Sequence, residues 1–333
     1  MTPPLCALTG AGGALGPVVA REFAEAGFAV RALGRKLLDP SLFPNGTELG
    51  IVDVLDREAI QRELSGVDTV VHMAALLHVV NPPPSLAVEY ERVNVGGTRN
   101  VLTGAATAGV RRLVLFSTIA VYGYGSGAIL DESSTPAPTT PYGVSKLEAE
   151  RVALAESAAD RVPLTTVLRL GAVYGSRVKG NYRRLVHSLA RGLFVGVGDG
   201  RNRRTLVYER DAARAAVAAA THAAAAGRIF NVTDGGFHTV REIVEAIGHA
   251  LGRGPRRFSI PTATARFAAG LIEDAFRISG RSAPLGRATI DKFVEDVAID
   301  GSLITREIGF HPDFDLERGW TETIAEMRRT GLL

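Results

Sequence analysis

Short apolar runs alternate with segments of helical periodicity along the first half of the chain. Leu5–Thr9 is an apolar run that ends in a glycine-rich turn, and residues 15–26 then place apolar side chains at helical spacing. Similar runs over residues 29–33, 50–54, 69–74, 113–118 and 164–169 predict further strands, with helices between them. Strands that alternate with helices predict an α/β fold, in which a doubly wound parallel sheet carries helices on both faces.

The alternation weakens after about residue 175. The chain then becomes rich in helical segments, with two long connections, over residues 252–261 and 282–286, that contain proline and arginine. We therefore predict one domain over residues 1–175 and a smaller, helix-rich C-terminal domain over residues 176–333. A strand-like run over residues 228–232 is expected to return to the first sheet, together with the segment near 205–232. The alanine-rich segment 212–226 predicts a closely packed helix, because alanine has the highest helix propensity.

Composition narrows the class of protein. The 333 residues are 46% apolar, but no segment reaches the roughly 20 apolar residues of a membrane span. No run of basic residues leads into an apolar stretch at the N-terminus, so we expect neither secretion nor membrane insertion. We therefore expect a soluble, cytoplasmic protein. The single cysteine, Cys6, excludes an intrachain disulfide, the seven histidines lack ligand-like spacing, and the net charge of +3 is dispersed. We expect no metal, no nucleic acid and no membrane as partners. Only four of the 38 basic residues are lysines, so each lysine is informative.

Glycines are spaced for a phosphate-binding turn between the first strand and the first helix. Gly10 permits a tight turn, Gly13 lets the backbone approach a pyrophosphate, and Gly16 lets helix and strand pack closely. The free N–H groups at the start of the helix favour an anion. The pattern predicts a Rossmann-like dinucleotide site in the first domain, and a turn that merely joins two elements is the alternative. The site would also use Gly12, Ala14 and Leu15.

The end of the second predicted strand indicates which dinucleotide is bound. An acidic side chain there would accept hydrogen bonds from the adenosine ribose, but residues 32–36 contain none and end in Arg35 and Lys36. The Arg35 guanidinium can pair with a 2′-phosphate, which favours NADP(H) and leaves NAD(H), or a solvated basic loop, as alternatives. Asp53, next to Val54, either accepts a hydrogen bond from adenine or caps a helix.

Tyr142 and Lys146 form the candidate catalytic pair. They lie four residues apart in a segment that follows Pro141, and this spacing places both on one face of a helix. A phenol is a poor acid or base at neutral pH, but an ammonium nearby stabilises the phenolate and lowers the phenol pKa. A surface pair is the alternative interpretation.

These motifs closely resemble those of the extended short-chain dehydrogenase/reductase family, which includes nucleotide-sugar epimerases, dehydratases and ketoreductases. The resemblance runs almost end to end, and it is carried by the Tyr-x-x-x-Lys pair and by segments 9–16, 72–75, 94–98, 116–123 and 168–175. It implies that Thr118 hydrogen-bonds the substrate carbonyl, that Tyr142 exchanges a proton with the substrate oxygen, and that Lys146 holds the nicotinamide ribose. It also implies that the cofactor lies along Met73, Ala74, Ala75 and Asn94, although Asn94 alternatively only holds the backbone.

The two residues after Thr118 indicate which reactions of the family this protein could catalyse. Dehydratases of this family carry an acidic pair there, whereas this chain has Ile119 and Ala120, so the resemblance disfavours dehydration. Because of Arg35, we expect NADPH-dependent reduction of a nucleotide 4-ketosugar. The alternatives are a nucleotide-sugar 4-epimerase with retained NAD, a hydroxysteroid-type alcohol dehydrogenase whose pocket is lined by residues 267–278, and a non-catalytic dinucleotide sensor.

A nucleotide sugar is the expected small-molecule substrate. Segment 198–208 resembles the loop and strand that hold the diphosphate in such enzymes, and Arg201, Arg203 and Arg204 suit that group, although clustered arginines also occur in solvated turns. Asn181 is a further candidate substrate contact. The resemblance also implies a homodimer through the helices that hold Asn94 and Tyr142, with Ala149, Ala153 and Ala155 allowing close approach.

Overall fold

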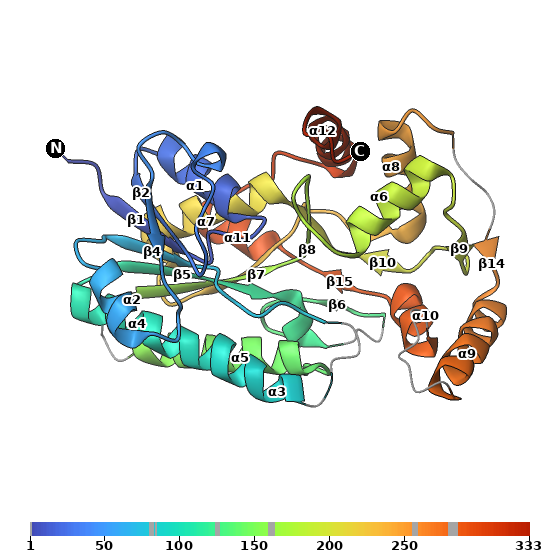
Figure 1. Ribbon diagram of the computed structural model, residues 1–333, viewed down its shortest axis with the longest axis horizontal. Helices are drawn as coiled ribbons and strands as arrows, with labels where there is room; N and C mark the ends of the chain where they lie inside the picture. Colours follow the sequence, from blue (N-terminus) through green and yellow to red (C-terminus); the bar gives the residue numbers. More distant parts are fainter. Residues whose placement is uncertain are drawn as a thin grey trace.

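A sheet of seven parallel strands forms the centre of the larger part of the molecule (Figure 1). The computed structural model describes residues 2–79, 83, 85–123, 127–158, 164–254, 259–278 and 286–333. The strand order in the sheet is β12-β7-β5-β4-β1-β2-β3. The strands are β1 (Leu5–Thr9), β2 (Ala29–Gly34), β3 (Glu48–Ile51), β4 (Thr69–His72), β5 (Arg112–Thr118), β7 (Leu164–Leu170) and β12 (Ile229–Val232). The predicted α/β fold with a doubly wound parallel sheet is confirmed.

The predicted strands match the structure best at the centre of the sheet. β1 has the predicted bounds, and β2, β4, β5 and β7 differ from them by at most two residues. The strand predicted over residues 50–54 was misplaced, because β3 covers Glu48–Ile51. β3 is the edge strand, and its Ile51 side chain is 61% exposed, whereas the buried Val52 and Val54 follow in a loop. An apolar run predicts a strand reliably only where both faces of the strand are buried.

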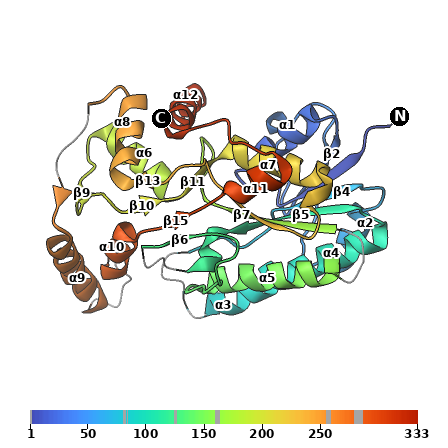
Figure 2. The same cartoon turned by 180° about the vertical axis from the view of Figure 1, so that it is seen from behind.

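Helices cover both faces of this sheet. α1 (Gly16–Glu25), α7 (Glu209–Thr221) and α11 (Ser302–Ile308) lie on one face, and α2 (Arg57–Glu63), α4 (Gly97–Ala108) and α5 (Pro141–Ala158) lie on the other (Figure 2). The alanine-rich segment forms α7, which begins three residues earlier than predicted and ends at Thr221, before a 3-10 turn over Ala223–Ala225. Its buried alanines let α7 pack closely against α1 and the sheet.

The C-terminal part carries its own apolar core beside the sheet. Tyr174 and Trp320 stack there with ring centroids 4.4 Å apart. The helices of this part are α6 (Asn181–Arg191), α8 (Val240–Ala250), α9 (Thr262–Ile278), α10 (Arg287–Val294) and α12 (Leu316–Arg329). Short strand pairs accompany them: β8 (Ala172–Tyr174) with β11 (Leu206–Tyr208), β10 (Arg203–Arg204) with β13 (His238–Thr239), β9 (Gly196–Val197) with β14 (Ser259–Ile260), and β6 (Ile129–Leu130) with β15 (Ala298–Ile299).

β12 follows α7 and pairs with β7, so the chain returns to the central sheet over residues 229–232. Residues 255–258 and 282–285 of the two predicted connections lie outside the described residues. Phe267 and Leu271 of α9 are 70% and 57% exposed, so they pack into no core of the described chain. Within the described residues, no helix has the length and apolar character needed to cross a bilayer.

Candidate active site

The glycine turn between β1 and α1 has the shape that a diphosphate requires. Gly10 has a φ of +75°, and a Cβ there would lie 2.6 Å from the backbone nitrogen of Ala74. A Cβ on Gly16 would overlap the Ala11 carbonyl, whereas a Cβ on Gly13 would meet only the Gly10 carbonyl oxygen, at 3.2 Å. Gly10 and Gly16 are therefore needed by the fold. Gly13 has no such packing constraint, which is expected of a position that a ligand approaches.

The start of α1 also suits an anion. Leu15 occupies the N-cap position and offers no side-chain acceptor, and the first turn of the helix contains no acidic residue. Unpaired N–H groups and the helix dipole favour negative charge at such an end. Gly12, Ala14 and Leu15 lie in this turn, so the residues present fit the diphosphate of a dinucleotide.

Arg35, Asp53 and Val54 were predicted to contact the adenosine part of the dinucleotide, and they differ in how the rest of the protein holds them. Arg35 directly follows β2 and is exposed. Asp53 accepts a hydrogen bond from the backbone N–H of Leu55 (3.0 Å), but it does not cap a helix. Asp56 caps α2 instead, by accepting from the N–H of Ala59. Val54 is buried and packs close to Gly97 of α4.

Thr118, Tyr142 and Lys146 converge at the carboxyl end of β5. Thr118 ends β5, Tyr142 lies in the first turn of α5, and Lys146 lies one turn further along the same helix. Burial, with a smaller contribution from Tyr90, raises the pKa of Tyr142 to about 12, and the Thr118 hydroxyl opposes the rise. Burial lowers the pKa of Lys146 to about 8, against the opposing effect of Glu150. The structure thus brings the three predicted catalytic residues together.

A buried ion pair fixes the helix that carries Tyr142 and Lys146. Arg169 of β7 and Glu150 of α5 approach to 2.7 Å, and their side chains are only 3% and 2% exposed. Ser117 of β5 donates a short hydrogen bond to the same carboxylate. Breaking such a pair would leave an uncompensated buried charge. α5 therefore has a fixed position against β5 and β7, and Lys146 has a carboxylate one helical turn away.

Asn94 holds the loop that follows β4. It lies in a π-helical turn over Glu91–Gly96, between α3 (Ser85–Tyr90) and α4. Its Oδ1 accepts from the N–H of Leu76 (2.7 Å), and its Nδ2 donates to the Leu76 carbonyl (3.2 Å) and to Ser145 Oγ (2.9 Å). Ser145 in turn donates to the Tyr142 carbonyl. Asn94 therefore ties α5 to the loop that begins with Met73, Ala74 and Ala75.

His72 is a structural anchor. Its Nδ1 lies 2.6 Å from Thr9 Oγ1, and its Nε2 lies 3.0 Å from Thr98 Oγ1, so the ring joins β1, β4 and α4. Burial, together with the charge of Lys146, lowers its pKa to about 3. The imidazole is neutral at physiological pH. Among the described residues, no group of three or more histidine, cysteine or acidic side chains is arranged to hold a metal.

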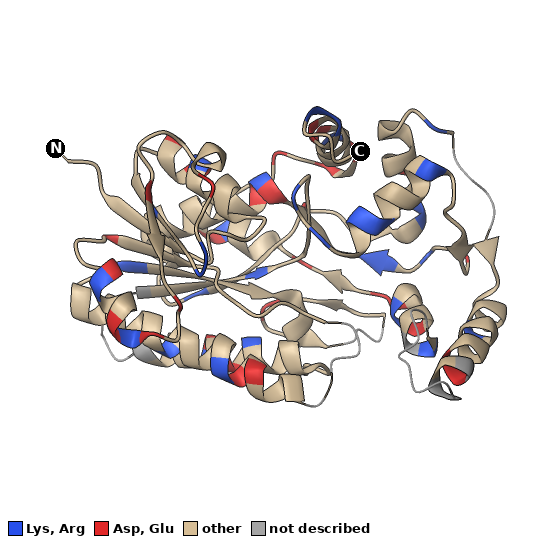
Figure 3. Cartoon of the chain, in the orientation of Figure 1, with Lys and Arg blue, Asp and Glu red and all other residues tan. Residues whose placement is uncertain are grey.

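The predicted substrate arginines have internal partners that the sequence did not indicate. Arg203 pairs with Asp296 and donates to the Gly127 carbonyl, and Arg204 donates to the carbonyls of Lys292 and Phe293. These contacts attach β10 to the end of α10. Arg201 is exposed and lies 3.6 Å from Asp199, and Asn181 begins α6. Several Lys and Arg positions lie along α6 and β10 in this part of the molecule (Figure 3).

The sequence indicated a structural or cofactor-adjacent role for His78, which lies beside Tyr142, but it gave no role to Lys292, which contacts His78. The His78 and Tyr142 rings have centroids 5.9 Å apart, and Lys292 Nζ lies 2.6 Å from His78 Nε2. The rarity of lysine was a usable signal for Lys292. No pattern along the chain linked it to residue 78.

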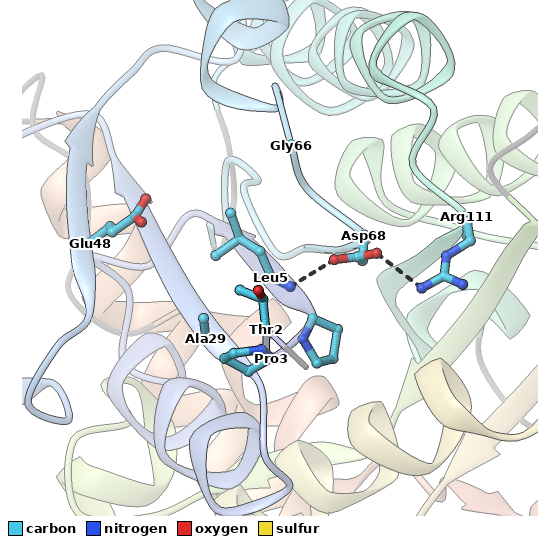
Figure 4. A pocket seen from close by; sticks show the side chains of 9 residues that line it. Thr2, Pro3, Leu5, Ala29, Glu48, Gly66, Asp68 and Arg111 are labelled. Atoms are coloured by element: carbon cyan, nitrogen blue, oxygen red, sulfur yellow. Dashed lines mark hydrogen bonds and ion pairs between the residues drawn. The ribbon is translucent and has the colours of Figure 1, made fainter.

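A shallow hollow lies at the opposite edge of the sheet. It is lined by Leu5, Ala29, Glu48, Asp68 and Arg111, all at or next to the amino ends of strands (Figure 4). Asp68 there accepts from the Leu5 N–H and pairs with Arg111. Ligands of open parallel sheets bind at the carboxyl ends of the strands, so this hollow is not part of the candidate active site.

The predicted alanine surface for dimer contacts was wrong for two of its three residues. Ala149 and Ala153 are fully buried within the chain, where Ala153 packs in the core under α4 and α5, and Ala155 is exposed. The two buried alanines bring α5 close to its own sheet, so they cannot face a second copy.

Known proteins resemble this chain over nearly its whole length. A 4-epimerase of N-acetyl-alpha-D-glucosaminyl-diphospho-ditrans,octacis-undecaprenol from Escherichia coli O157:H7 is 28% identical over 319 residues, covering 95% of this chain and 93% of that protein. A 3 beta-hydroxysteroid dehydrogenase/Delta 5-->4-isomerase from Mycobacterium tuberculosis (strain CDC 1551 / Oshkosh) is 26% identical over 335 residues, covering 95% and 88%. The solved structure of MoeE5 in complex with UDP-glucuronic acid and NAD has a TM-score of 0.76 and 28% identity, and the match covers 98% and 99% of the two chains.

The model of the NAD dependent epimerase/dehydratase family matches residues 6–233. That span contains the glycine turn, Thr118, Tyr142 and Lys146, and it covers well over half of the chain. The resemblance to the extended short-chain dehydrogenases is confirmed, and so is the expectation that the protein is an enzyme of this type. The chain belongs to the NAD dependent epimerase/dehydratase family.

Proposed function

We propose that this protein is a nucleotide-sugar 4-epimerase that retains NAD. The observation that carries the proposal is the placement of Thr118, at the carboxyl end of β5, next to Tyr142, with Lys146 one turn further along the same helix. The 4-epimerase relative and the UDP-sugar and NAD complex of MoeE5 support it. This reverses the preference drawn from the sequence, which was for reduction with NADPH.

The residues divide the chemistry between them. Bound NAD would accept a hydride from C4 of the sugar and return it. Tyr142 takes the proton from the C4 hydroxyl and gives it back, while Thr118 donates a hydrogen bond to the same oxygen. A pKa near 12 disfavours the phenolate in the free protein, so the nearby Lys146 ammonium has to stabilise that form. Ile119 and Ala120 supply neither acid nor base, which disfavours elimination of water.

The diphosphate of the sugar nucleotide is assigned to the C-terminal part. Residues 176–333 would form most of the substrate domain, with residues 1–175 and the returning β12 forming the cofactor domain. We assign Asn181, Arg201 and Arg204 as candidate contacts. Arg203 enters this proposal only through its ion pair with Asp296, which fixes β10.

NADPH-dependent reduction of a 4-ketosugar is the second candidate, and Arg35 is the observation that favours it. This side chain is exposed at the end of β2, and the residues from Ala32 to Lys36 include no acid. Arg35→Asp should lower NADPH affinity about tenfold or more and raise the preference for NADH, because a carboxylate repels the 2′-phosphate. Fluorescence titration with both nucleotides measures this ratio. An unchanged ratio would remove the support for the second candidate.

Mass spectrometry of the nucleotide released from purified protein tests the proposal. An epimerase regenerates its own cofactor, so we expect close to one NAD per chain. An empty site that binds NADPH in preference to NADH would favour the reductase instead. A steroid alcohol as substrate, suggested by the hydroxysteroid relative, would give oxidation of the alcohol with added NAD and no change of UDP-glucose. A non-catalytic sensor would bind the dinucleotide and turn over neither.

A homodimer through α4 and α5 is a separate proposal. Val144 of α5 is 52% exposed, so an apolar side chain is available on that helix. Light scattering on the purified protein distinguishes a monomer of 35.2 kDa from a dimer.

A further inference from the structure

Lys292 of α10 extends its side chain to the loop that follows β4. Its Nζ lies 2.6 Å from Nε2 of His78, in the loop after β4. The His78 ring lies beside that of Tyr142, with centroids 5.9 Å apart and planes inclined at 54°. An ammonium from the C-terminal part therefore contacts a ring that neighbours the residue to which we assign proton transfer. The inference that follows rests on that proposed function.

The His78 side of this contact is held in place. The Tyr90 hydroxyl donates to the Leu77 carbonyl (2.8 Å) and accepts from the Val79 N–H (3.1 Å), so it clamps both neighbours of His78. Tyr90 also contacts Tyr142 edge to face, with centroids 6.0 Å apart. Because Asn94 fixes Leu76 as well, His78 has little freedom to move away from Tyr142.

The Lys292 side is equally constrained. Arg204 donates to the carbonyls of Lys292 (2.5 Å) and Phe293 (3.1 Å), and the Asn202 amide donates to those of Phe293 (3.0 Å) and Glu295 (2.9 Å). The end of α10 is thus attached to β10 and to the residue before it. The contact between Lys292 and His78 joins two fixed points of the fold.

The charges around the contact leave it positive. Among the described residues, Lys292 and Arg204 face the Glu295 carboxylate, which lies 3.9 Å from Arg204, while the neighbouring Arg203 and Asp296 neutralise each other. Burial lowers the pKa of His78, and the Lys292 charge lowers it further, so the imidazole is neutral and accepts from the ammonium. A neutral ring is a weaker partner for a half-buried ammonium than a carboxylate or phosphate oxygen.

We propose that Lys292, positioned by His78, binds an anionic group of the substrate beside Tyr142. Substrate binding would replace the neutral imidazole by a carboxylate or phosphate oxygen at Nζ. His78 acts as a positioning residue, because it holds the ammonium at this place before substrate arrives. The anion is either the diphosphate of the sugar nucleotide or a carboxylate on the sugar itself.

Titration calorimetry of the purified holoenzyme with UDP-glucuronic acid and with UDP-glucose tests this. Lys292→Met removes the charge and keeps an unbranched side chain, and we expect at least a tenfold loss of affinity. His78→Leu should weaken the same ligands, and His78→Gln, which retains an acceptor, should restore part of the affinity. Arg111→Met is the matched control, because it removes one positive charge at the opposite edge of the sheet, where Arg111 pairs with Asp68, and it should leave both affinities unchanged.

The two ligands distinguish the sources of the anion. A loss confined to UDP-glucuronic acid assigns Lys292 to a sugar carboxylate, and an equal loss for both ligands assigns it to the diphosphate; either result supports the inference. Unchanged affinity of Lys292→Met for both ligands overturns it.

A separate measurement covers failure of the proposed function. If the unmodified protein binds neither sugar nucleotide, the proposed function fails. Inorganic phosphate is then titrated while the NMR shift of the His78 ring nitrogens is followed. A saturating shift that Lys292→Met abolishes supports anion binding by Lys292, and its absence overturns the inference.

Discussion

Lys146 is a cation that the fold buries at the place where it is needed for chemistry. Its side chain is almost fully enclosed, and burial lowers its pKa from 10.5 to about 8. A lysine whose pKa is lower in the folded state than in the unfolded state reduces stability at every pH below the folded pKa, because unfolding lets it take up a proton more readily. Catalytic use of Lys146 therefore has a cost in stability.

Lys146→Met should remove this cost along with the activity. At pH 7 we expect the free energy of unfolding to rise by up to about 3 kcal/mol, since each pKa unit corresponds to about 1.4 kcal/mol. The gain should shrink between pH 8 and 10.5, where the folded wild-type protein loses its proton before the unfolded chain does. Urea unfolding at pH 7 and pH 9.5 measures both values. If Lys146→Met were less stable than the wild-type protein at pH 7, the buried Lys146 ammonium would not be a net cost to stability.

Single residues were predictable where the chemistry restricts the residue type. Tyr142 and Lys146 were identified from their spacing together with the rarity of lysine and the glycine turn, and the structure places Thr118 close to Tyr142. The partners of Arg203 and Arg204 were not predictable, because Asp296 and the carbonyls of α10 lie about 90 residues further along the chain. Local patterns carry no information about such distant contacts.

At the scale of elements, different glycines of the turn between β1 and α1 are needed for folding and for binding of the dinucleotide. Gly16 is packed against Ala11, whereas Gly13 has open space beyond the Gly10 carbonyl oxygen. Gly16→Ala should therefore destabilise the protein by several kcal/mol or prevent folding, because the backbone must shift. Gly13→Ala should fold normally and lose most of its bound dinucleotide. Thermal unfolding and the nucleotide content of each purified variant test this, and loss of nucleotide without loss of stability in Gly16→Ala would contradict it.

The contact of His72 with β1 and α4 makes stability depend on pH. Its pKa is about 3 in the folded state and about 6.5 in the unfolded state, so below pH 6.5 the unfolded chain takes up a proton that the folded protein does not. Because of this difference in proton uptake, the free energy of unfolding should fall by about 2 kcal/mol from pH 7 to pH 5. His72→Asn should be less stable at pH 7 and lose this part of the slope. Equal slopes for the two proteins in urea unfolding would show that His72 does not titrate as described.

Elements were predictable to the extent that burial makes them uniform. β1, β4, β5 and β7 are enclosed on both faces, and the apolar runs of the sequence locate them. β3 at the edge was misplaced because its exposed residues do not follow that pattern. The π-helical turn that presents Asn94 had no sequence signal at all, since its residues also suit an ordinary helix.

At the scale of the whole molecule, the site is assembled from both ends of the chain. The glycine turn and Tyr142 come from the sheet and its helices, and Lys292 comes from α10 (Figure 1). The arrangement of strands and the family could be predicted from the first half of the sequence, because its motifs are local. The contacts between the two parts could not be predicted from the sequence, because they depend on how α10 and β10 pack against the loop after β4.

Tyr142 is the residue to which we assign proton transfer in a C4 epimerisation of a nucleotide sugar. Proton NMR of UDP-glucose incubated with the purified protein, without added cofactor, tests this assignment most directly, with Tyr142→Phe as the matched variant. We expect the wild-type protein to produce UDP-galactose until equilibrium is reached, and the variant, with its NAD retained, to be slower by a factor of about 10² to 10⁴. Equal rates for the two proteins, or binding of UDP-glucose by the wild-type protein without any epimer, would contradict the account.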